Sequence, residues 1–228
     1  MLYKTVREGT FICRPNRFTA HVLIDGSPET VHVKNTGRCR EILQEGARVL
    51  LEEASNPERK TRYSLISAWK GDVLINIDSQ APNEAVFRAL KECRLPSFGD
   101  LPVIRRERFF GASRFDLYFE APGRKGFIEV KGVTLERDGT ALFPDAPTVR
   151  GTRHVYEMAR AVEEGYEGYI LFLIQMKGVT CFTPNRVMDP AFSDSLTEAR
   201  SRGVRILAFD CAVTENNLVP DREIPVIL

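Results

Sequence analysis

The sequence predicts an α+β protein of two domains, a small OB-like β-barrel over residues 1–80 and a larger domain of αβββαβ order over residues 81–228. Three observations predict this. Apolar and polar residues alternate in the first third of the chain, as in strands. After about residue 80 the apolar residues recur every 3.6 residues, as in helices. One continuous apolar run in the second half is typical of a strand buried on both faces.

The barrel is predicted from alternation and from turn signals. Apolar residues alternate with polar ones over residues 18–24 and again over residues 73–77. Turn sequences separate the runs, at Asp25-Gly26-Ser27-Pro28, Asn35-Thr36-Gly37, Asn56-Pro57 and Lys70-Gly71-Asp72. Short apolar runs bounded by Gly, Pro, Asn and Asp are typical of strands joined by tight turns. We therefore expect about six short strands before Asp78.

The second domain is expected to begin with a helix at Pro82, because proline is favoured in the first turn of a helix. Apolar residues follow at helical spacing, at Ala85, Val86, Ala89 and Leu90. Strands are then expected near Val103–Glu107, Arg114–Phe119 and Phe127–Val133. These elements supply the first αβββ of the predicted order.

Two more helices and two more strands complete the expected fold. Thr148 is a natural N-cap for a helix that begins at Val149 and ends before Gly165. The run YILFLI at residues 169–174 predicts a strand covered on both faces. A helix over Pro190–Arg202 and a last strand, VRILAF at residues 204–209, follow.

Composition excludes several classes of protein. The chain is 43% hydrophobic and 28% charged, which is typical of a globular protein. No apolar run approaches the roughly 20 residues of a membrane helix, and the N-terminus has no apolar signal-peptide core. The net charge of +1 indicates nothing about a polyanionic partner. We therefore expect a cytoplasmic protein without a membrane partner.

Cysteine and histidine spacing argues against disulfides and zinc. The five cysteines include no CxxC pair, so we expect reduced and mostly buried thiols, at Cys13, Cys39, Cys93, Cys181 and Cys211. The three histidines, at positions 21, 32 and 154, have no His or Cys at metal-ligand spacing.

The segment SRFDLYFEAPGRKGFIEVKGVTL contains the candidate catalytic residues. Glu129 and Lys131 are two residues apart on a predicted strand, so their side chains leave the same face. A hairpin turn centred on Pro122-Gly123 would pair Asp116 with Glu129, and a register shifted by two would pair it with Lys131. Either register places Asp116 on that face.

Two opposed carboxylates repel each other unless a cation lies between them. Mg²⁺ or Mn²⁺ is the expected ion, with Asp116 and Glu129 as metal ligands, because these ions accept carboxylates together with waters and substrate phosphate. Lys131 could hold the attacking water or offset charge on phosphorus. A cross-strand ion pair on a solvated face is the alternative, and apolar residues on both sides of the cluster argue against it.

Basic residues form three candidate nucleic-acid contacts. One group is Lys34, Arg38 and Arg40 in the barrel, and a second is Arg59, Lys60 and Arg62, with Tyr63 and Trp69 nearby. The third is Arg150, Arg153 and His154 at a helix N-terminus, where anions are favoured. Basic residues near aromatics suit single strands and phosphates. Solvated charged faces and ordinary helix capping are the alternatives. Gln175, at a strand end, is expected to be a satisfied polar residue.

Five segments in order, HVKNTGRCREIL, NPERKTRYSL, SRFDL, EVKGVTL and FPDAPTVRGTRH, resemble the sugar fermentation stimulation protein family, SfsA. The resemblance covers nearly the whole chain. It implies an N-terminal OB-like domain, DNA binding, and a C-terminal domain similar to the PD-(D/E)xK nucleases. In that group Asp116, Glu129 and Lys131 would be the catalytic and metal-binding positions.

This sequence departs from the family pattern at Gly132, Val149 and Arg153, where serine, glutamate and lysine are common. If the glutamate that is common at position 149 binds a second metal ion, this chain lacks that ligand, and a one-metal site remains. A glutamate on the helix before the sheet also belongs to the nuclease pattern, with Glu84 as its candidate here.

The sequence leaves two main functions open. The first is a Mg²⁺-dependent nuclease that acts on nucleic acid, with DNA as the expected partner. The second is a non-catalytic DNA-binding regulator of sugar (maltose) metabolism, although no helix-turn-helix pattern supports it. A sugar or sugar-phosphate enzyme is a distant third, and no phosphate-cradling glycine loop supports it. The sequence is compatible with a homodimer and does not require one.

Overall fold

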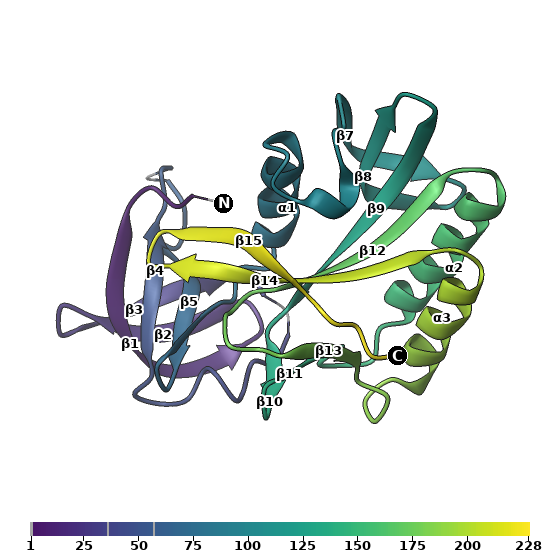
Figure 1. The fold of residues 1–228 in the computed structure, drawn as a ribbon. Helices are drawn as coiled ribbons and strands as arrows, with labels where there is room; N and C mark the ends of the chain where they lie inside the picture. The colour runs from purple at the N-terminus through teal and green to yellow at the C-terminus, as the bar shows by residue number, and fades with distance from the viewer. Residues whose placement is uncertain (1, 36, 57) are drawn as a thin grey trace.

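The computed structural model describes residues 2–35, 37–56 and 58–228 (Figure 1). Two of the expected turns include Thr36 and Pro57, which lie outside the described residues. The N-terminal strands are β1 (Val6–Asn16), β2 (Thr19–Ile24), β3 (Ser27–Val33), β4 (Arg48–Glu53), β5 (Tyr63–Lys70) and β6 (Val73–Asn76). They are the strands that the alternation predicts.

The N-terminal strands form a closed barrel. Their hydrogen-bonded order is β3-β2-β1-β4-β5-β6, and a parallel pairing of β3 with β5 closes β1 to β5 into a ring. Asp25 and Gly26, both at positive φ, make the tight turn between β2 and β3. The prediction of an OB-like barrel is confirmed.

The second domain is built on a mixed sheet of order β15-β14-β12-β9-β8-β7. Its strands are β7 (Val103–Phe110), β8 (Ser113–Ala121), β9 (Arg124–Val133), β12 (Glu167–Ile174), β14 (Arg205–Thr214) and β15 (Asn217–Ile224). As the apolar run predicts, β12 is central: it lies parallel to β9 and β14 and is buried on both faces.

Helices cover both faces of this sheet (Figure 1). Helix α1 (Ala81–Lys91) packs on one face, against Leu117, Ile128 and Val130. Helices α2 (Val149–Glu163) and α3 (Pro190–Ser201) pack on the other face, in a core that includes Phe127 and Val133. That second core is continuous with the interior of the barrel.

Several elements differ from the sequence prediction. The chain continues past the expected last strand. After β14 it reverses direction and forms β15, which pairs with β14 in antiparallel fashion. A small sheet of order β10-β11-β13 was also not predicted; it contains β10 (Leu135–Arg137), β11 (Thr140–Phe143) and β13 (Cys181–Pro184). Its strands have only three or four residues, too few for a visible period.

The barrel and the second domain are joined by polar contacts. The main-chain N–H of Asn76 donates to the carbonyl of Gln175 at 2.9 Å, and the Gln175 amide donates to the Asn76 side chain at 2.8 Å. At the turn between β14 and β15, the carbonyl of Asn216 accepts from the N–H of Tyr3 at 2.8 Å. Strand β6 ends at Asn76 and α1 begins at Ala81. The division of the chain after residue 80 stays a prediction.

All five cysteines are free thiols. Cys39 and Cys211 are buried, Cys181 is half-buried, and Cys13 and Cys93 are exposed, so the expectation of mostly buried thiols is wrong. Cys13 lies on β1 beyond its pairing with β4, which ends at Thr10, and Cys93 follows the end of α1, so neither side chain is covered by a neighbouring element. None of the helices in the described residues is long and apolar enough to cross a membrane.

Candidate active site

The candidate site forms where β8 and β9 separate. The hairpin turns at Pro122-Gly123, with Gly123 at positive φ, and pairs Ala121 with Arg124 through Leu117 with Ile128. One residue beyond the last pair, this register brings Asp116 opposite Glu129. It is the first of the two registers that the sequence allows.

The strand alternation breaks at Asp116. Phe115 packs in the core on the α2 side, whereas Leu117 packs in the core on the α1 side, although the two are separated by one residue. On the neighbouring strand β7, Glu107 adopts a positive φ of 53° where it would pair with Asp116. Phe115 therefore contributes to the core on the α2 side and not to the α1 face. The irregularity lets the Asp116 side chain turn into the gap between the strands.

Glu129 is the most buried group of the cluster, with 3% of its surface exposed. Its Oε1 accepts from Lys131 Nζ at 2.6 Å and lies 2.6 Å from Nδ1 of His154 on α2. Its Oε2 is also buried and has no hydrogen-bond partner among the described residues. A buried carboxylate oxygen without a donor is costly, so this atom is suited to a cation.

His154 holds Glu129 from the helix side. Nε of Arg150 donates to Nε2 of His154 at 3.5 Å, so Nε2 must accept and Nδ1 carries the proton that is donated to Glu129. His154 is only 3% exposed. This corrects the expected surface contact with nucleic acid, because position 154 lies on the face of α2 that packs against β9.

Asp116 is held by two neutral donors. Its Oδ2 accepts from the main-chain N–H of Val130 at 2.8 Å, and its Oδ1 accepts from the amide of Asn83 on α1 at 2.7 Å. Burial, and then the negative charge of Glu129, raise its pKa to about 6, against the opposing effect of Lys131. For Glu129, burial would raise the pKa, but Lys131 and His154 together hold it below its usual range.

The pair of carboxylates fits a hard divalent ion. Mg²⁺ is commonly held by one or two carboxylates, with waters and substrate phosphate in the other positions. Asp116 and the unpartnered Oε2 of Glu129 are the groups that could provide such ligands. Within the residues that the structure describes, no group of three His, Cys, Asp or Glu could hold a metal ion. The candidate ligands within the described residues are these two carboxylates.

The other polar positions considered in the sequence analysis do not point to a further metal ligand. Glu84 forms ion pairs with Arg88, at 2.5 Å, and with Arg106, so its carboxylate is already compensated. Val149, which stands where glutamate is common in the family, is 86% exposed at the start of α2. Gln175 is buried and bonded to Asn76, as expected for a satisfied polar residue.

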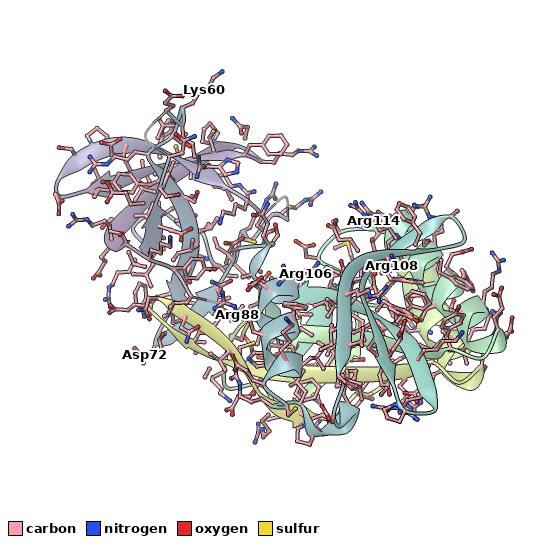
Figure 2. The ribbon with its side chains drawn as sticks, turned by 90° about the horizontal axis from the view of Figure 1, so that it is seen from above. Lys60, Asp72, Arg88, Arg106, Arg108 and Arg114 are labelled. Carbon is pink, nitrogen blue, oxygen red and sulfur yellow. The ribbon has the colours of Figure 1, made fainter. Side chains whose placement is uncertain are left out.

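The predicted nucleic-acid residues do not form one surface. Arg38 and Arg40 are exposed and line a pocket at the rim of the barrel. Figure 2 shows Lys60 on the outer part of the barrel, far from the β7–β8 edge of the second domain. Its neighbour Arg62 is exposed but paired with Glu53 at 2.8 Å.

Three further predicted contacts have different surroundings. Lys34 is mostly buried and pairs with buried Asp78 at 2.7 Å, which corrects its expected role as a free surface cation. Arg59 is exposed and donates to Ser64 at 3.2 Å. On α2, Arg150 is exposed beside His154, whereas Arg153 lines a separate apolar hollow with Pro147 and Tyr156.

The sequence analysis missed two features near Asp116. Asn83 bonds its carboxylate, and no sequence signal marks an asparagine on α1 for this contact. Arginines also lie on β7 and β8, the two strands at this edge of the sheet, where Figure 2 shows Arg106, Arg108 and Arg114. Arg106 and Arg108 lie in the segment IRRERFF at residues 104–110, which could have indicated a basic edge strand.

Comparison with known proteins gives matches over nearly the whole chain. Residues 12–77 match the family model of the SfsA N-terminal OB domain, and residues 80–217 match that of the sugar fermentation stimulation protein RE domain. A sugar fermentation stimulation protein homolog of Alkaliphilus oremlandii is 58% identical over 224 residues, covering 96% of this chain and 95% of that protein.

Two further comparisons agree. A homolog from Desulfitobacterium hafniense is 55% identical over 218 residues, 96% of this chain and 94% of that protein. The solved structure of Pyrococcus furiosus SfsA in complex with Ca²⁺ has 28% sequence identity and a TM-score of 0.91, over 100% of this chain and 98% of that one.

Proposed function

This chain belongs to the sugar fermentation stimulation protein family, and from that premise we propose that it is a metal-dependent nuclease that hydrolyses phosphodiester bonds. In this proposal the barrel holds the nucleic acid, with DNA as the first candidate. The second domain hydrolyses the nucleic acid in a site formed by Asp116, Glu129 and Lys131.

One observation carries the proposal: the buried Oε2 of Glu129 has no donor among the described residues and lies in a cluster with Asp116. A protein that only binds phosphate gains nothing from two carboxylates that repel phosphate. A related protein, Pyrococcus furiosus SfsA, is described in complex with Ca²⁺. Ca²⁺, like Mg²⁺ and Mn²⁺, is a cation that prefers oxygen ligands.

Each residue has a distinct task in this proposal. Asp116 and Glu129 would hold Mg²⁺ or Mn²⁺, which supplies a Lewis acid and a more acidic bound water. His154 fixes the rotamer of Glu129 through its Nδ1 proton, and Asn83 fixes that of Asp116. Lys131, now 2.6 Å from Glu129, would orient the attacking water or stabilise charge that develops on the phosphate.

A DNA-binding regulator without turnover is the second candidate, favoured by the arginine-lined pocket of the barrel. A single cleavage assay distinguishes the two. Purified protein is incubated with labelled single-stranded and double-stranded DNA and RNA, each with Mg²⁺, Mn²⁺ or EDTA. A nuclease cuts at least one substrate in the presence of metal and none in EDTA.

The variant Lys131→Ala tests whether cleavage comes from this site. It should lose cleavage by on the order of 10²-fold or more, because a charge that stabilises the transition state is removed. Its affinity for nucleic acid in EDTA should be unchanged. Lys4→Ala is the matched control, since Lys4 is exposed and lies before β1, outside the candidate site. Cleavage by Lys131→Ala at the rate of the control would contradict the assignment.

A further inference from the structure

The rim of the barrel contains a pocket of about 670 Å³ that the catalytic proposal does not use. It lies between the turn that joins β1 to β2 and the loop that follows β3. Its charged lining consists of Arg14, Arg17, Arg38 and Arg40, and its apolar lining includes Phe11 and Leu43. A volume of this size is in the range of sites that bind small molecules.

Three of the four arginines are free to bind an anion. No carboxylate in the described part of the chain lies within ion-pairing distance of Arg17, Arg38 or Arg40, whereas Arg48, Arg62 and Arg88 are all paired. All three are exposed. Guanidinium groups that gather around one hollow with no carboxylate in an ion pair with them repel each other, so the arrangement favours an anionic ligand.

The fourth arginine holds the pocket in shape. Arg14 Nη1 donates to the carbonyls of Gly37 and Arg38 at 2.7 and 3.2 Å. Its Nη2 donates to the carbonyls of Arg17 and Asn35 at 2.8 and 2.5 Å. Arg14 therefore fastens the segment that carries Arg38 to the turn that carries Arg17, and the backbone positions of these two arginines are held before any ligand binds.

The second domain completes the pocket. Ala146, which lies just before α2, is part of its wall. The N–H of Arg38 donates to Asp145 Oδ2 at 3.2 Å, and a Cβ at Gly37 would come within 2.5 Å of that oxygen. Asn35 and Asp145 also line a smaller cavity with Gly132, the residue after Lys131. The pocket and the catalytic cluster thus share one domain junction.

We infer that this pocket binds one nucleotide unit of a single-stranded nucleic acid. The guanidinium groups of Arg17, Arg38 and Arg40 contact its phosphate, and the base lies against the apolar wall. A stacked duplex keeps its bases inside the helix and cannot place one in such a hollow, whereas an unstacked strand can. The inference rests on the proposed function in taking nucleic acid as the substrate.

The test measures binding in EDTA, where cleavage does not occur. A labelled single strand of roughly 10 nucleotides, within the site size of an OB fold, is titrated into the full-length protein. The pocket variant is Arg17→Ala with Arg40→Ala. The control is Arg7→Ala with Arg200→Ala, which removes the same charge from exposed positions on β1 and α3. Melting temperatures of both variants check that they fold.

The pocket variant should bind the single strand about tenfold more weakly or worse, since it loses charge-assisted hydrogen bonds from two guanidinium groups to the phosphate. The control should change by about twofold at most, the effect of distant charge alone. Equal weakening in both variants would overturn the inference. So would an equal loss of affinity for a duplex of the same sequence.

Two ligand variants distinguish the remaining possibilities. A strand with abasic sites has the same phosphates but no bases, and it should bind the wild-type protein more weakly than the intact strand. Equal binding would overturn the assignment of the base to the apolar wall. Free thymidine monophosphate should compete only weakly, and competition as strong as that of the strand would mean that the pocket takes mononucleotides instead.

The two proposals fail in different ways. If the wild-type protein cuts nothing with any metal, the nuclease proposal fails, and the binding results in EDTA still stand. If the protein cuts nucleic acid but the pocket and control variants bind alike, only the pocket assignment fails.

Discussion

Asp116 and Glu129 are both buried carboxylates, but their surroundings give them different charge. Two cationic or proton-donating side chains, Lys131 and His154, contact Glu129 and keep it ionised. Asp116 has only neutral donors, from Asn83 and the backbone of Val130, and its pKa is raised to about 6. Near neutral pH the pair therefore carries excess negative charge at its Asp116 side, where a divalent ion would compensate it.

At the residue scale, the first prediction concerns the metal. Mg²⁺ or Mn²⁺ should raise the melting temperature of the wild-type protein at pH 8, because a ligand that binds only the folded state stabilises it. The increase should be absent in Asp116→Asn and present in Asp138→Asn. Asp138 is an exposed turn residue at positive φ, which asparagine also tolerates. Differential scanning fluorimetry with and without metal measures the effect.

The opposite result has a definite meaning. If no divalent ion shifts the melting temperature and Asp116→Asn destabilises the metal-free protein, the cluster is a structural ion pair. The proposal of a DNA-binding regulator would then replace that of a nuclease.

The second prediction at this scale concerns pH. The pKa of Asp116 is raised to about 6 in the folded protein, whereas an aspartate in an unfolded chain titrates near about 3.9. The folded state thus binds this proton more tightly. The stabilisation that protonated Asp116 gives to the metal-free protein is fully present below about pH 4 and is lost as the pH rises through about 6.

Comparison with Asp116→Asn isolates this contribution, because asparagine does not titrate. The free energy of unfolding of the wild-type protein, relative to the variant, should rise by up to about 3 kcal/mol between pH 8 and pH 4. Urea denaturation of both proteins in EDTA across this range is the measurement. A difference that stays constant with pH would show that the carboxyl is not perturbed.

At the scale of elements, the start of α2 connects capping with the site. Thr148 Oγ1 accepts from the N–H of Gly151 at 3.0 Å, and the N–H of Thr148 donates to buried Asp189 at 2.8 Å. The turns that follow carry His154, which holds Glu129, and Arg150, which donates to His154. The cap therefore sets the position of a helix whose inner face completes the candidate site.

The third prediction is that Thr148→Ala lowers the free energy of unfolding by about 1 kcal/mol, since it removes an N-cap side chain. Thr197→Ala is the control. Thr197 lies inside α3, where alanine is the better helix former, so this change should be neutral or slightly stabilising. Both values come from chemical denaturation. Equal effects of the two substitutions would mean that the cap contributes nothing.

At the scale of the whole molecule, Gln175 fastens the barrel to the central sheet. Its amide donates to the Asn76 carbonyl and side chain and to the Asp78 carbonyl, and its own N–H donates to Val133. Val133 is two residues beyond Lys131 on β9. One residue, Gln175, therefore contacts both the barrel, through its side chain, and strand β9, through its main chain.

The fourth prediction follows from this connection. Gln175→Ala should lower the free energy of unfolding by about 1–3 kcal/mol, because buried acceptors lose their donor. Gln80→Ala, at an exposed position beside α1, should change it by about 0.5 kcal/mol at most. Calorimetry would also show whether the barrel and the sheet still melt together. A wild-type melting curve for Gln175→Ala would contradict a structural role for the contact.

The fifth prediction concerns the charge of the whole surface. Binding of nucleic acid should weaken steeply with salt, because each phosphate contact releases a counterion. Arg38→Ala with Arg40→Ala should reduce the slope of log affinity against log salt by roughly one to two. Lys60→Ala with Arg62→Ala should reduce it less, since Arg62 is already paired with Glu53. Affinity that does not change with salt would remove nucleic acid as the partner.

Local sequence determined much of the fold. The period of two predicted the barrel strands, the Thr148 cap and Gly165 bounded α2, and the continuous apolar run identified the central strand β12. The turn at Pro122-Gly123 fixed the register that sets Asp116 opposite Glu129. These features depend on neighbours along the chain, so the sequence by itself determined them. It also determined the family, through motifs that occur in order along nearly the whole chain.

Only the tertiary structure decided how these elements meet. The sequence predicted His154 and Lys34 as nucleic-acid contacts. In the structure, the packing of α2 places His154 against Glu129, and closure of the barrel places Lys34 against Asp78. Likewise, Asn83 joins Asp116, and Arg14 assembles the pocket from segments that are 20 or so residues apart. Burial and charge compensation depend on which residues come together in space. Sequence periodicity reports only which way a side chain points within its own element.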